Sequence, residues 1–325
     1  MSWQHLANRV LEGYQITKTE ALGIVNSSPD ELLALLQAAF RVRRRYFGRT
    51  VHLHVLRNAR SGLCPEDCRF CSQSSAYNTG VPDYPMQTVS SLVDGARKAK
   101  ASGAARYCMV TATRGPSKRD LDTICEAVKV IKDEFPTLEL CTSLGLLTKS
   151  KAQRLKDAGV DRYNHNLETS ARHFETMVTT HGYEDRVNTI AAAHEVGMQA
   201  CCGGIVGMGE TLEDQVDLAM ALRDLEVESI PVNFLDPRPG TPLGDCERLT
   251  PHQCLVTLAM FRFVNPSRDI RVAGGREVNL GHMQAFALYP ANSIFTEGYL
   301  TPLGNQHSSD HEMIRQAGFE ILEVL

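Results

Sequence analysis

Three cysteines in one short segment are the residues whose spacing points most directly to chemistry. Cys64, Cys68 and Cys71 follow the pattern C-x3-C-x2-C, and Pro65 and Asp67 stand between the first two. Three thiolates at this spacing can hold three irons of a cubane 4Fe-4S cluster while the fourth iron keeps an open position. Because an open iron can bind a small molecule, the segment predicts a catalytic iron-sulfur site.

A structural metal site is the alternative for these cysteines. Zinc normally takes a fourth Cys or His at similar spacing, but the next cysteine, Cys108, lies far along the chain. His52 and His54 stand upstream on an expected strand. Unconnected buried cysteines fit less well, since Gly, Pro and Asp in the segment indicate a loop. We therefore favour the cluster.

The elements that would position the cysteines alternate between strand and helix after a helical beginning. Helices are expected first at residues 2–12, 19–25 and 29–46. Short β-rich segments follow at residues 51–58, 106–111, 138–142, 162–167, 199–205, 229–234, 269–272 and 291–295. Helical segments fit between or after them at residues 89–100, 121–135, 149–158, 183–196, 212–225, 251–264, 278–287 and 310–317.

Eight strand-helix units predict an α/β protein whose core is a parallel (β/α)8 TIM-type barrel. We expect the barrel domain to span residues 51–325 and an N-terminal helical extension to span residues 1–50. Active sites of such barrels lie at the carboxyl ends of the strands. The cysteine segment follows the first expected strand directly, so the cluster should lie at this catalytic rim.

Polar residues also fall on the later strands, where a closed barrel normally points branched apolar side chains inward. Arg106 and Cys108 are two apart and share a strand face, as do Asn164 and Asn166. Further strands carry Cys141, Cys201, Asn233 and Arg271. Buried polar groups need partners, so an interior lined in this way should hold a ligand. From composition alone, an arginine such as Arg271 would be a salt-bridge residue.

Three longer strings resemble the biotin synthase family of the radical S-adenosylmethionine superfamily. They are LCPEDC at residues 63–68, YNHNLETS at residues 163–170 and GGIVGMGET at residues 203–211, and the similarity runs from about residue 57 to about residue 294. The resemblance implies that S-adenosylmethionine chelates the open iron of the 4Fe-4S cluster. One electron then cleaves it to methionine and a 5'-deoxyadenosyl radical. The implied reaction is sulfur insertion into dethiobiotin to give biotin.

The resemblance also implies an auxiliary 2Fe-2S cluster inside the barrel, from which the sulfur is drawn. Its ligands by motif position are Cys108, Cys141, Cys201 and Arg271. Cys202 adjoins Cys201, and neighbouring strand residues face opposite ways, so only one of the two should enter the interior. Motif position favours Cys201. A contribution from Cys202 and another nuclearity both stay open.

Motif matching further implies the residues that bind S-adenosylmethionine. Asn166 and Glu168 would bind its ribose hydroxyls, Arg186 would pair with its carboxylate, and the glycine string with Gly204 and Gly207 would pack against it. Many family members have Asp where Glu168 stands, so this contact involves one extra methylene. The match assigns no general acid, general base or nucleophile.

The same resemblance places the ureido ring of dethiobiotin against amide side chains, which both donate and accept hydrogen bonds. The matching residues are Asn164, Asn166 and Asn233. Taken singly, each asparagine could instead cap a turn or a strand end. The segment of residues 301–303, Thr-Pro-Leu, follows the family's threonine-rich loop only loosely, so no contact to the substrate carboxylate is assigned.

Composition limits the classes of binding partner and the cellular compartment that we expect for this protein. The 325 residues are 43% hydrophobic and carry a formal net charge of −4, which argues against a nucleic-acid or membrane-surface partner. Ten cysteines, three of them in a loop that needs reduced thiolates, indicate a reducing compartment. The first residues show no secretory signal and no segment is apolar enough to span a bilayer, so we expect a cytoplasmic protein.

The family resemblance also implies protein partners, and two alternative functions remain to be compared with it. It implies a flavodoxin or ferredoxin electron donor, iron-sulfur assembly proteins and a homodimer. Another radical S-adenosylmethionine barrel enzyme, such as a cofactor or hydrogenase maturase, would share the cluster loop but lack the inner cysteines and arginine. A non-catalytic iron-sulfur sensor would need neither the glycine string nor a polar interior.

Overall fold

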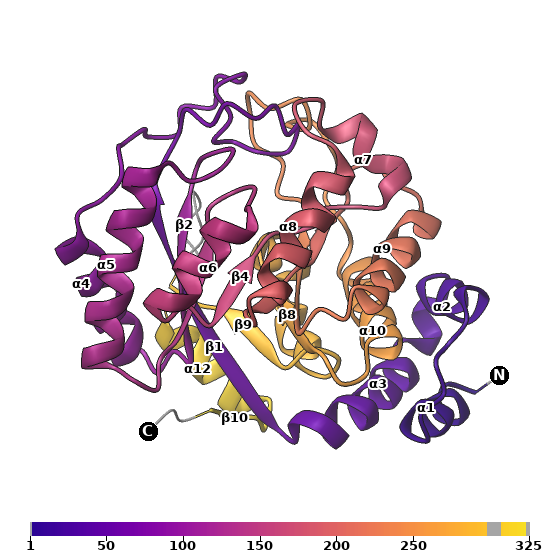
Figure 1. Ribbon diagram of the computed structural model, residues 1–325. Coiled ribbons are helices and arrows are strands. Elements are labelled where there is room, and N and C mark those ends of the chain that lie inside the picture. Colours follow the sequence, from indigo (N-terminus) through magenta and orange to yellow (C-terminus); the bar gives the residue numbers. More distant parts are fainter. Residues whose placement is uncertain (1, 298–306, 323–325) are drawn as a thin grey trace.

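The computed structural model describes residues 2–297 and 307–322, and its centre is a closed barrel of parallel strands (Figure 1). Each strand pairs in parallel with the next, and β9 pairs back with β1 to close the ring. The predicted (β/α)8 TIM-type barrel is confirmed. In order around the ring, the strands are β1 (Thr50–Arg60), β2 (Arg106–Thr111), β3 (Glu139–Ser143), β4 (Arg162–Asn164), β5 (Gln199–Cys201) with β6 (Gly204–Val206), β7 (Ser229–Phe234), β8 (Asp269–Val272) and β9 (Ser293–Phe295).

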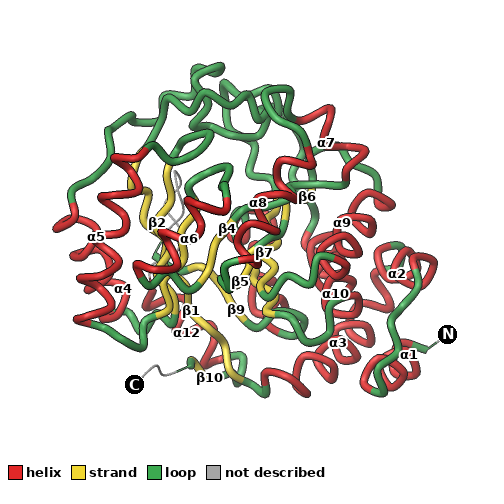
Figure 2. Tube along the Cα trace, viewed as in Figure 1, coloured by secondary structure: helices red, strands yellow, loops and turns green. Residues whose placement is uncertain are grey.

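Helices cover the outside of the ring, and the connecting loops gather over the carboxyl ends of the strands (Figure 2). The helices are α1 (Trp3–Leu11), α2 (Lys18–Val25), α3 (Leu32–Phe47), α4 (Val89–Ala101), α5 (Lys118–Glu134), α6 (Lys149–Ala158), α7 (Ala171–Met177), α8 (Tyr183–Glu195), α9 (Leu212–Asp224), α10 (Pro251–Val264), α11 (Arg276–Leu280) and α12 (His307–Gln316). Two 3-10 helices, η1 (Pro29–Glu31) and η2 (Gly281–Leu288), complete the described set.

Alternation along each strand separates an apolar outer layer from a polar interior. In β2, Tyr107 and Met109 pack outward against helix residues such as Leu92 of α4 and Ile124 of α5. Cys108 instead lies among inner residues. The apolar outer face therefore stabilises the barrel, which leaves the inner positions available for chemistry.

The predicted fifth strand, residues 199–205, is in fact broken into β5 and β6. At Gly203 an added Cβ would lie 1.9 Å from the carbonyl oxygen of Pro231, and at Gly204 it would lie 2.4 Å from that of Glu168. The missing side chains let three backbone segments approach one another, and the strand bends there. Helix α7 and the short strand β10 (Glu320–Ile321), which pairs with β1, were not predicted, and the expected helix at residues 278–287 is divided between α11 and η2.

Helices α2 and α3 pack against the barrel on the side of α9 and α10, and α1 packs on α3 (Figure 1). Leu35 and Leu36 of α3 share one buried apolar cluster with Leu258 of α10. A capping box between Thr17 and Glu20 begins α2. Within the described residues, no helix has the length and apolar character needed to cross a membrane. Residues 301–303 lie outside the described residues.

Candidate functional site

The loop of residues 62–73, here called the cluster loop, leaves β1 at the carboxyl end of the barrel and is folded by its own hydrogen bonds. The backbone N–H of Cys64 donates to the carbonyl of Gln73 at 3.0 Å, and that of Cys71 donates to the carbonyl of Cys68 at 2.9 Å. The side-chain oxygen of Gln73 in turn accepts the N–H of Gly62 at 3.1 Å. These bonds bend the loop back on itself and gather its three thiols.

Two acidic residues between the first two cysteines fasten the loop to the segment before α8. Asp67 accepts the backbone N–H groups of Thr179 at 2.9 Å and Thr180 at 3.2 Å, and Glu66 accepts from the His181 ring and the Thr180 hydroxyl. Burial alone would raise the pKa of Asp67, but the donors from Thr179 and Thr180 lower it to about 2. Sequence reasoning missed this clamp, although two adjacent acids inside a cysteine motif could have signalled it.

The chemistry of the three thiols fits a metal cluster. Burial raises the pKa of Cys71 to about 11 and also raises the pKa of Cys64 and Cys68, because a buried thiolate is poorly solvated. An iron ion supplies the positive charge that converts such thiols to thiolates. The guanidinium of Arg186 lies 3.9 Å from the Cys68 sulfur and adds a second positive charge at the site.

The residues expected to bind S-adenosylmethionine form one hydrogen-bonded group beside the cluster loop. Arg186 contacts the Glu168 carboxylate at 3.2 Å and the backbone carbonyl of Asn166 at 2.7 Å. Glu168 has a φ of 70°, a left-handed conformation that costs a non-glycine residue about 1–3 kcal/mol. Among the described residues, the buried Nε of Arg186 has no hydrogen-bond partner. A buried donor needs an acceptor, so the group fits an anionic ligand.

The two expected glycines, Gly204 and Gly207, shape the backbone next to this hydrogen-bonded group. Gly204 leaves room for the carbonyl of Glu168, and Gly207 has a φ of 98°, which favours glycine. Neither residue lines the cavity at this site, whereas Ile205 between them does. Their placement supports the backbone around Glu168.

A cavity of about 350 Å³ joins the cluster loop to the barrel interior. Among its lining residues are Cys71, Cys108, Asn164, Asn166, Asn233 and Arg271. The amide of Asn164 donates to the Cys201 sulfur at 3.2 Å, and Asn233 accepts the N–H of Gly274 at 2.8 Å. The two asparagines are thus oriented by protein contacts before any ligand binds. The cavity can hold a small molecule between the two groups of cysteines.

The inner site consists of Cys108, Cys141, Cys201 and Arg271, which come from four separate strands and meet inside the barrel. The three cysteines pack against one another, and Nη2 of Arg271 lies 3.4 Å from the Cys201 sulfur. Among the described residues, the buried Nε of Arg271 has no partner. Three thiols and an unsatisfied guanidinium form a donor set that fits an iron-sulfur cluster. Cys202 instead packs in the outer apolar cluster and is fully buried there.

Of the remaining cysteines, only Cys246 packs near a group, in the apolar cluster that also contains Cys68 and Cys71. All ten cysteines are free, and none forms a disulfide. Cys125 is half-buried on α5, Cys254 is buried on α10 and Cys246 is half-buried in the loop before α10. The structure therefore gathers the six expected cysteines into two groups of three, and it leaves Cys125, Cys202 and Cys254 outside both groups.

Comparison with known proteins agrees with this site. The radical SAM superfamily model matches residues 60–222, and the model of the biotin and thiamin synthesis associated domain matches residues 231–320. Two solved structures share the fold: methylornithine synthase, with a TM-score of 0.84 and 20% identity over 98% of this chain and 97% of that one, and the FeFe-hydrogenase maturase of Carboxydothermus hydrogenoformans, with a TM-score of 0.82 and 16% identity over 99% of this chain and 79% of that one.

The barrel, the three-cysteine loop and the superfamily match define a radical S-adenosylmethionine enzyme, whose cofactors are a 4Fe-4S cluster and S-adenosylmethionine. Comparison with curated relatives identifies the family within this superfamily. The chain is 56% identical to the biotin synthase of Salinibacter ruber over 98% of this chain and 89% of the relative, and 49% identical to that of Halalkalibacterium halodurans over 100% of this chain and 97% of the relative. The chain belongs to the biotin synthase family.

Proposed function

We propose that the enzyme converts dethiobiotin to biotin with sulfur drawn from an auxiliary 2Fe-2S cluster held at the inner site. The observation that carries the proposal is the meeting of Cys108, Cys141 and Cys201 beside Arg271 at the base of the cavity. When bound, the 4Fe-4S cluster and S-adenosylmethionine supply the one-electron chemistry that breaks unactivated carbon-hydrogen bonds.

The chain's own residues then bind and orient the reactants. Cys64, Cys68 and Cys71 would hold the 4Fe-4S cluster through the preformed cluster loop. Arg186 would pair with the carboxylate of S-adenosylmethionine. Support comes from its buried and unpartnered Nε, among the described residues, and its place on the cavity wall. Asn166 and Glu168 line the same wall and would bind the ribose hydroxyls.

Substrate orientation would come from three amides. Asn164, Asn166 and Asn233 all line the cavity, and each can donate to or accept from the ureido ring of dethiobiotin. The cavity lies between Cys71 of the cluster loop and Cys108 of the inner site. A substrate bound there would therefore have S-adenosylmethionine on one side and the sulfur source on the other, which is the order that the reaction needs.

The origin of the sulfur is tested by isotope transfer. We reconstitute the enzyme anaerobically with ³⁴S-labelled sulfide, remove free sulfide and run a single turnover with unlabelled reagents. Biotin that carries the heavy isotope is expected, and unlabelled biotin would overturn the sulfur-donor role. In Cys141→Ala, deoxyadenosine should still form without biotin. Cys254→Ala, which removes a buried thiol far from both sites, is the matched control and should make biotin normally.

We further propose a cytoplasmic homodimer that takes electrons from flavodoxin or ferredoxin and receives its clusters from iron-sulfur assembly proteins. Ten free cysteines, several of them needed as thiolates, support a reducing compartment. We also propose that residues 1–50 form a helical extension of the barrel domain of residues 51–325, since α2 and α3 pack directly on α10. Light scattering of the reconstituted protein measures the oligomeric state, and a monomer would overturn the dimer.

A further inference from the structure

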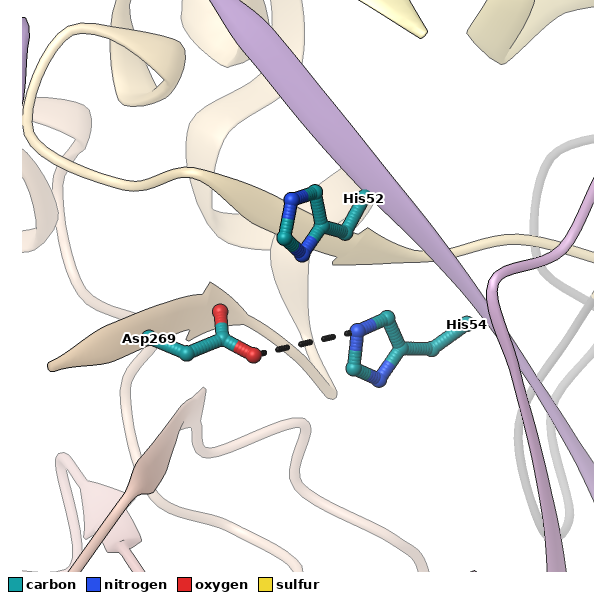
Figure 3. A group of neighbouring side chains, drawn as sticks. All are labelled: His52, His54 and Asp269. Atoms are coloured by element: carbon teal, nitrogen blue, oxygen red, sulfur yellow. Dashed lines mark ion pairs between the residues drawn. The ribbon is translucent and has the colours of Figure 1, made fainter. Parts of the chain in front are cut away.

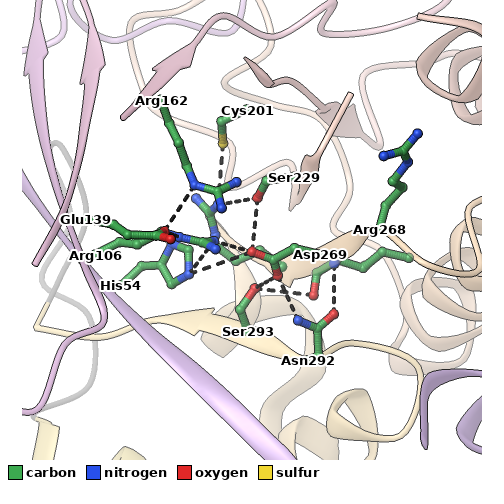
Figure 4. A network of polar contacts seen from close by, with 12 residues as sticks. His54, Arg106, Glu139, Arg162, Cys201, Ser229, Arg268, Asp269, Asn292 and Ser293 are labelled. Carbon is green, nitrogen blue, oxygen red and sulfur yellow. Dashed lines mark hydrogen bonds and ion pairs between the residues drawn. The ribbon is translucent and has the colours of Figure 1, made fainter. Parts of the chain in front are cut away.

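A buried carboxylate on β8 is the centre of a polar network beneath the inner site (Figure 4). Asp269 is 6% exposed and stands two residues before Arg271, so both side chains point into the barrel while Ile270 between them packs outward. Its oxygens accept hydrogen bonds from the side chains of Arg106, Ser229, Asn292 and Ser293. Such a carboxylate is fixed in position by its donors.

One of those donors connects the carboxylate to the inner site. The hydroxyl of Ser229 accepts from Nη2 of Arg271 at 2.8 Å and lies 3.2 Å from Oδ2 of Asp269. Because an ionised carboxylate only accepts, the single Ser229 proton points to Asp269 and its lone pair faces Arg271. The same Nη2 lies 3.4 Å from the Cys201 sulfur. The chain of hydrogen bonds from Asp269 through Ser229 to Arg271, here called the relay, therefore holds one edge of the guanidinium. The same group remains directed at the inner thiols.

The charges of the network leave a surplus at Arg271. Arg106 forms ion pairs with both Glu139 and Asp269, and Arg162 contacts Glu139 at 3.1 Å. Within the described part of the chain, Arg271 has no ion pair of its own, so the guanidinium groups of Arg106, Arg162 and Arg271 exceed the two carboxylates by one positive charge. The four side-chain hydrogen bonds of Asp269 come from donors, namely Arg106, Ser229, Asn292 and Ser293, which is the arrangement that an ionised carboxylate requires.

The same carboxylate belongs to a group that could suggest a metal ion. His52, His54 and Asp269 bring ligand atoms within 4.8 Å of one another (Figure 3). However, Nη1 of Arg106 lies 3.2 Å from Nε2 of His54 and pairs with Asp269. A guanidinium already supplies the positive charge that a metal would bring, so the group serves charge compensation within the barrel.

We propose that Asp269 is the positioning residue of the inner site: acting through the Ser229 hydroxyl, it holds Arg271 against the three inner thiols. This inference rests on the proposed auxiliary cluster and adds the contact that orients its arginine. The carboxylate also balances Arg106, whose charge would otherwise repel Arg271 within the same low-dielectric interior.

Two serine variants test this contact, because the hydroxyls of Ser229 and Ser293 both donate to Asp269 but, of the two, only that of Ser229 accepts a hydrogen bond from the Arg271 guanidinium. In Ser229→Ala the ratio of biotin to deoxyadenosine should fall about five-fold, the effect of one lost hydrogen bond. The EPR signal of the reduced auxiliary cluster should also shift. Ser293→Ala should keep the wild-type ratio and spectrum. Equal effects of the two variants, or a wild-type spectrum in Ser229→Ala, would overturn the positioning role.

A third variant separates orientation from charge. Asp269→Asn should move the reduction potential of the auxiliary cluster to a more positive value, because a nearby negative charge has been removed. Ser229→Ala keeps that charge and should leave the potential close to that of the wild type. If Asp269→Asn does not fold, the serine pair still decides. If the wild-type protein held no auxiliary cluster, the proposed inner site itself would be overturned. If the cluster were lost in Cys141→Ala but its EPR spectrum were unchanged in Ser229→Ala, only the relay would be overturned.

Discussion

The adjacent pair Cys201 and Cys202 offers the sharpest test of the inner site, because two identical side chains face opposite sides of the chain at the end of β5. The Cys201 sulfur lies within 3.4 Å of Arg271 and 3.2 Å of the Asn164 amide. Cys202 packs with Leu167 in the outer apolar cluster and is fully buried. The same substitution at the two positions therefore removes a ligand in one case and a packing group in the other.

Cys202→Ala removes one buried sulfur, which is comparable in size to a methylene group, and should lower the free energy of unfolding by about 1 kcal/mol. Its auxiliary cluster and biotin yield should stay at the wild-type level. Cys201→Ala should lose the auxiliary cluster and biotin formation while deoxyadenosine is still produced. Urea denaturation of the cluster-free proteins measures the first quantity, and Mössbauer spectroscopy with product analysis measures the others.

The opposite pattern would refute the assignment. Loss of the auxiliary cluster in Cys202→Ala, with an intact cluster in Cys201→Ala, would mean that the strand presents its other face to the interior. Loss in both variants would mean that the bend at Gly203 couples the two positions. The cluster-loop signal, which neither substitution touches, serves as an internal control for complete reconstitution.

Three further outcomes follow from the contacts described. Cys68→Ala should abolish deoxyadenosine formation, and an undiminished yield would contradict the cluster-loop assignment. Arg271→Lys should keep more biotin formation than any inner cysteine variant, because lysine retains the positive charge; equal losses would make the guanidinium indispensable. The Glu228 carboxylate raises the pKa of His194, so this pair stabilises the fold at a pH below about 6.5 and loses that contribution as the pH rises through the raised value. His194→Gln should therefore reduce the fall in unfolding free energy between about pH 6 and about pH 8, measured by urea denaturation, and an unchanged fall would exclude the pair.

The barrel could be predicted because its signals are local. Strands β2, β7 and β8 and helices α6 and α10 begin and end where alternation, capping residues and turn residues indicated. Helix α7 has only seven residues, too few to establish a helical period, and it escaped prediction. The break between β5 and β6 arises because backbone from Glu168 and Pro231 presses on Gly203 and Gly204, and no single segment of sequence records that approach.

The candidate site likewise has features that local sequence predicts and features that it does not. The cysteine loop and the inward positions of β2 follow from spacing and from a period of two, whereas β4 ends at Asn164 and leaves Asn166, expected on the same strand, in the loop beyond it. The pairing of residues across the barrel cannot be predicted in this way. Arg106 and Asp269 are 163 residues apart in the sequence, and the clamp residues Asp67 and Thr180 are 113 residues apart. Charged residues on inner strand faces could be recognised one by one. Their pairing depends on closure of the ring, which is a property of the whole fold.

Because the inner site draws on β2, β3, β5 and β8, its parts leave the ribosome at widely different times. Cys71, the last thiol of the cluster loop, is synthesised 200 residues before Arg271, an interval of about 10–40 s at 5–20 residues per second. The ring closes later still, when β9 pairs with β1. During that interval the loop thiols have no finished barrel around them, so protection from oxidation and from premature metal capture has to come from the surroundings of the growing chain.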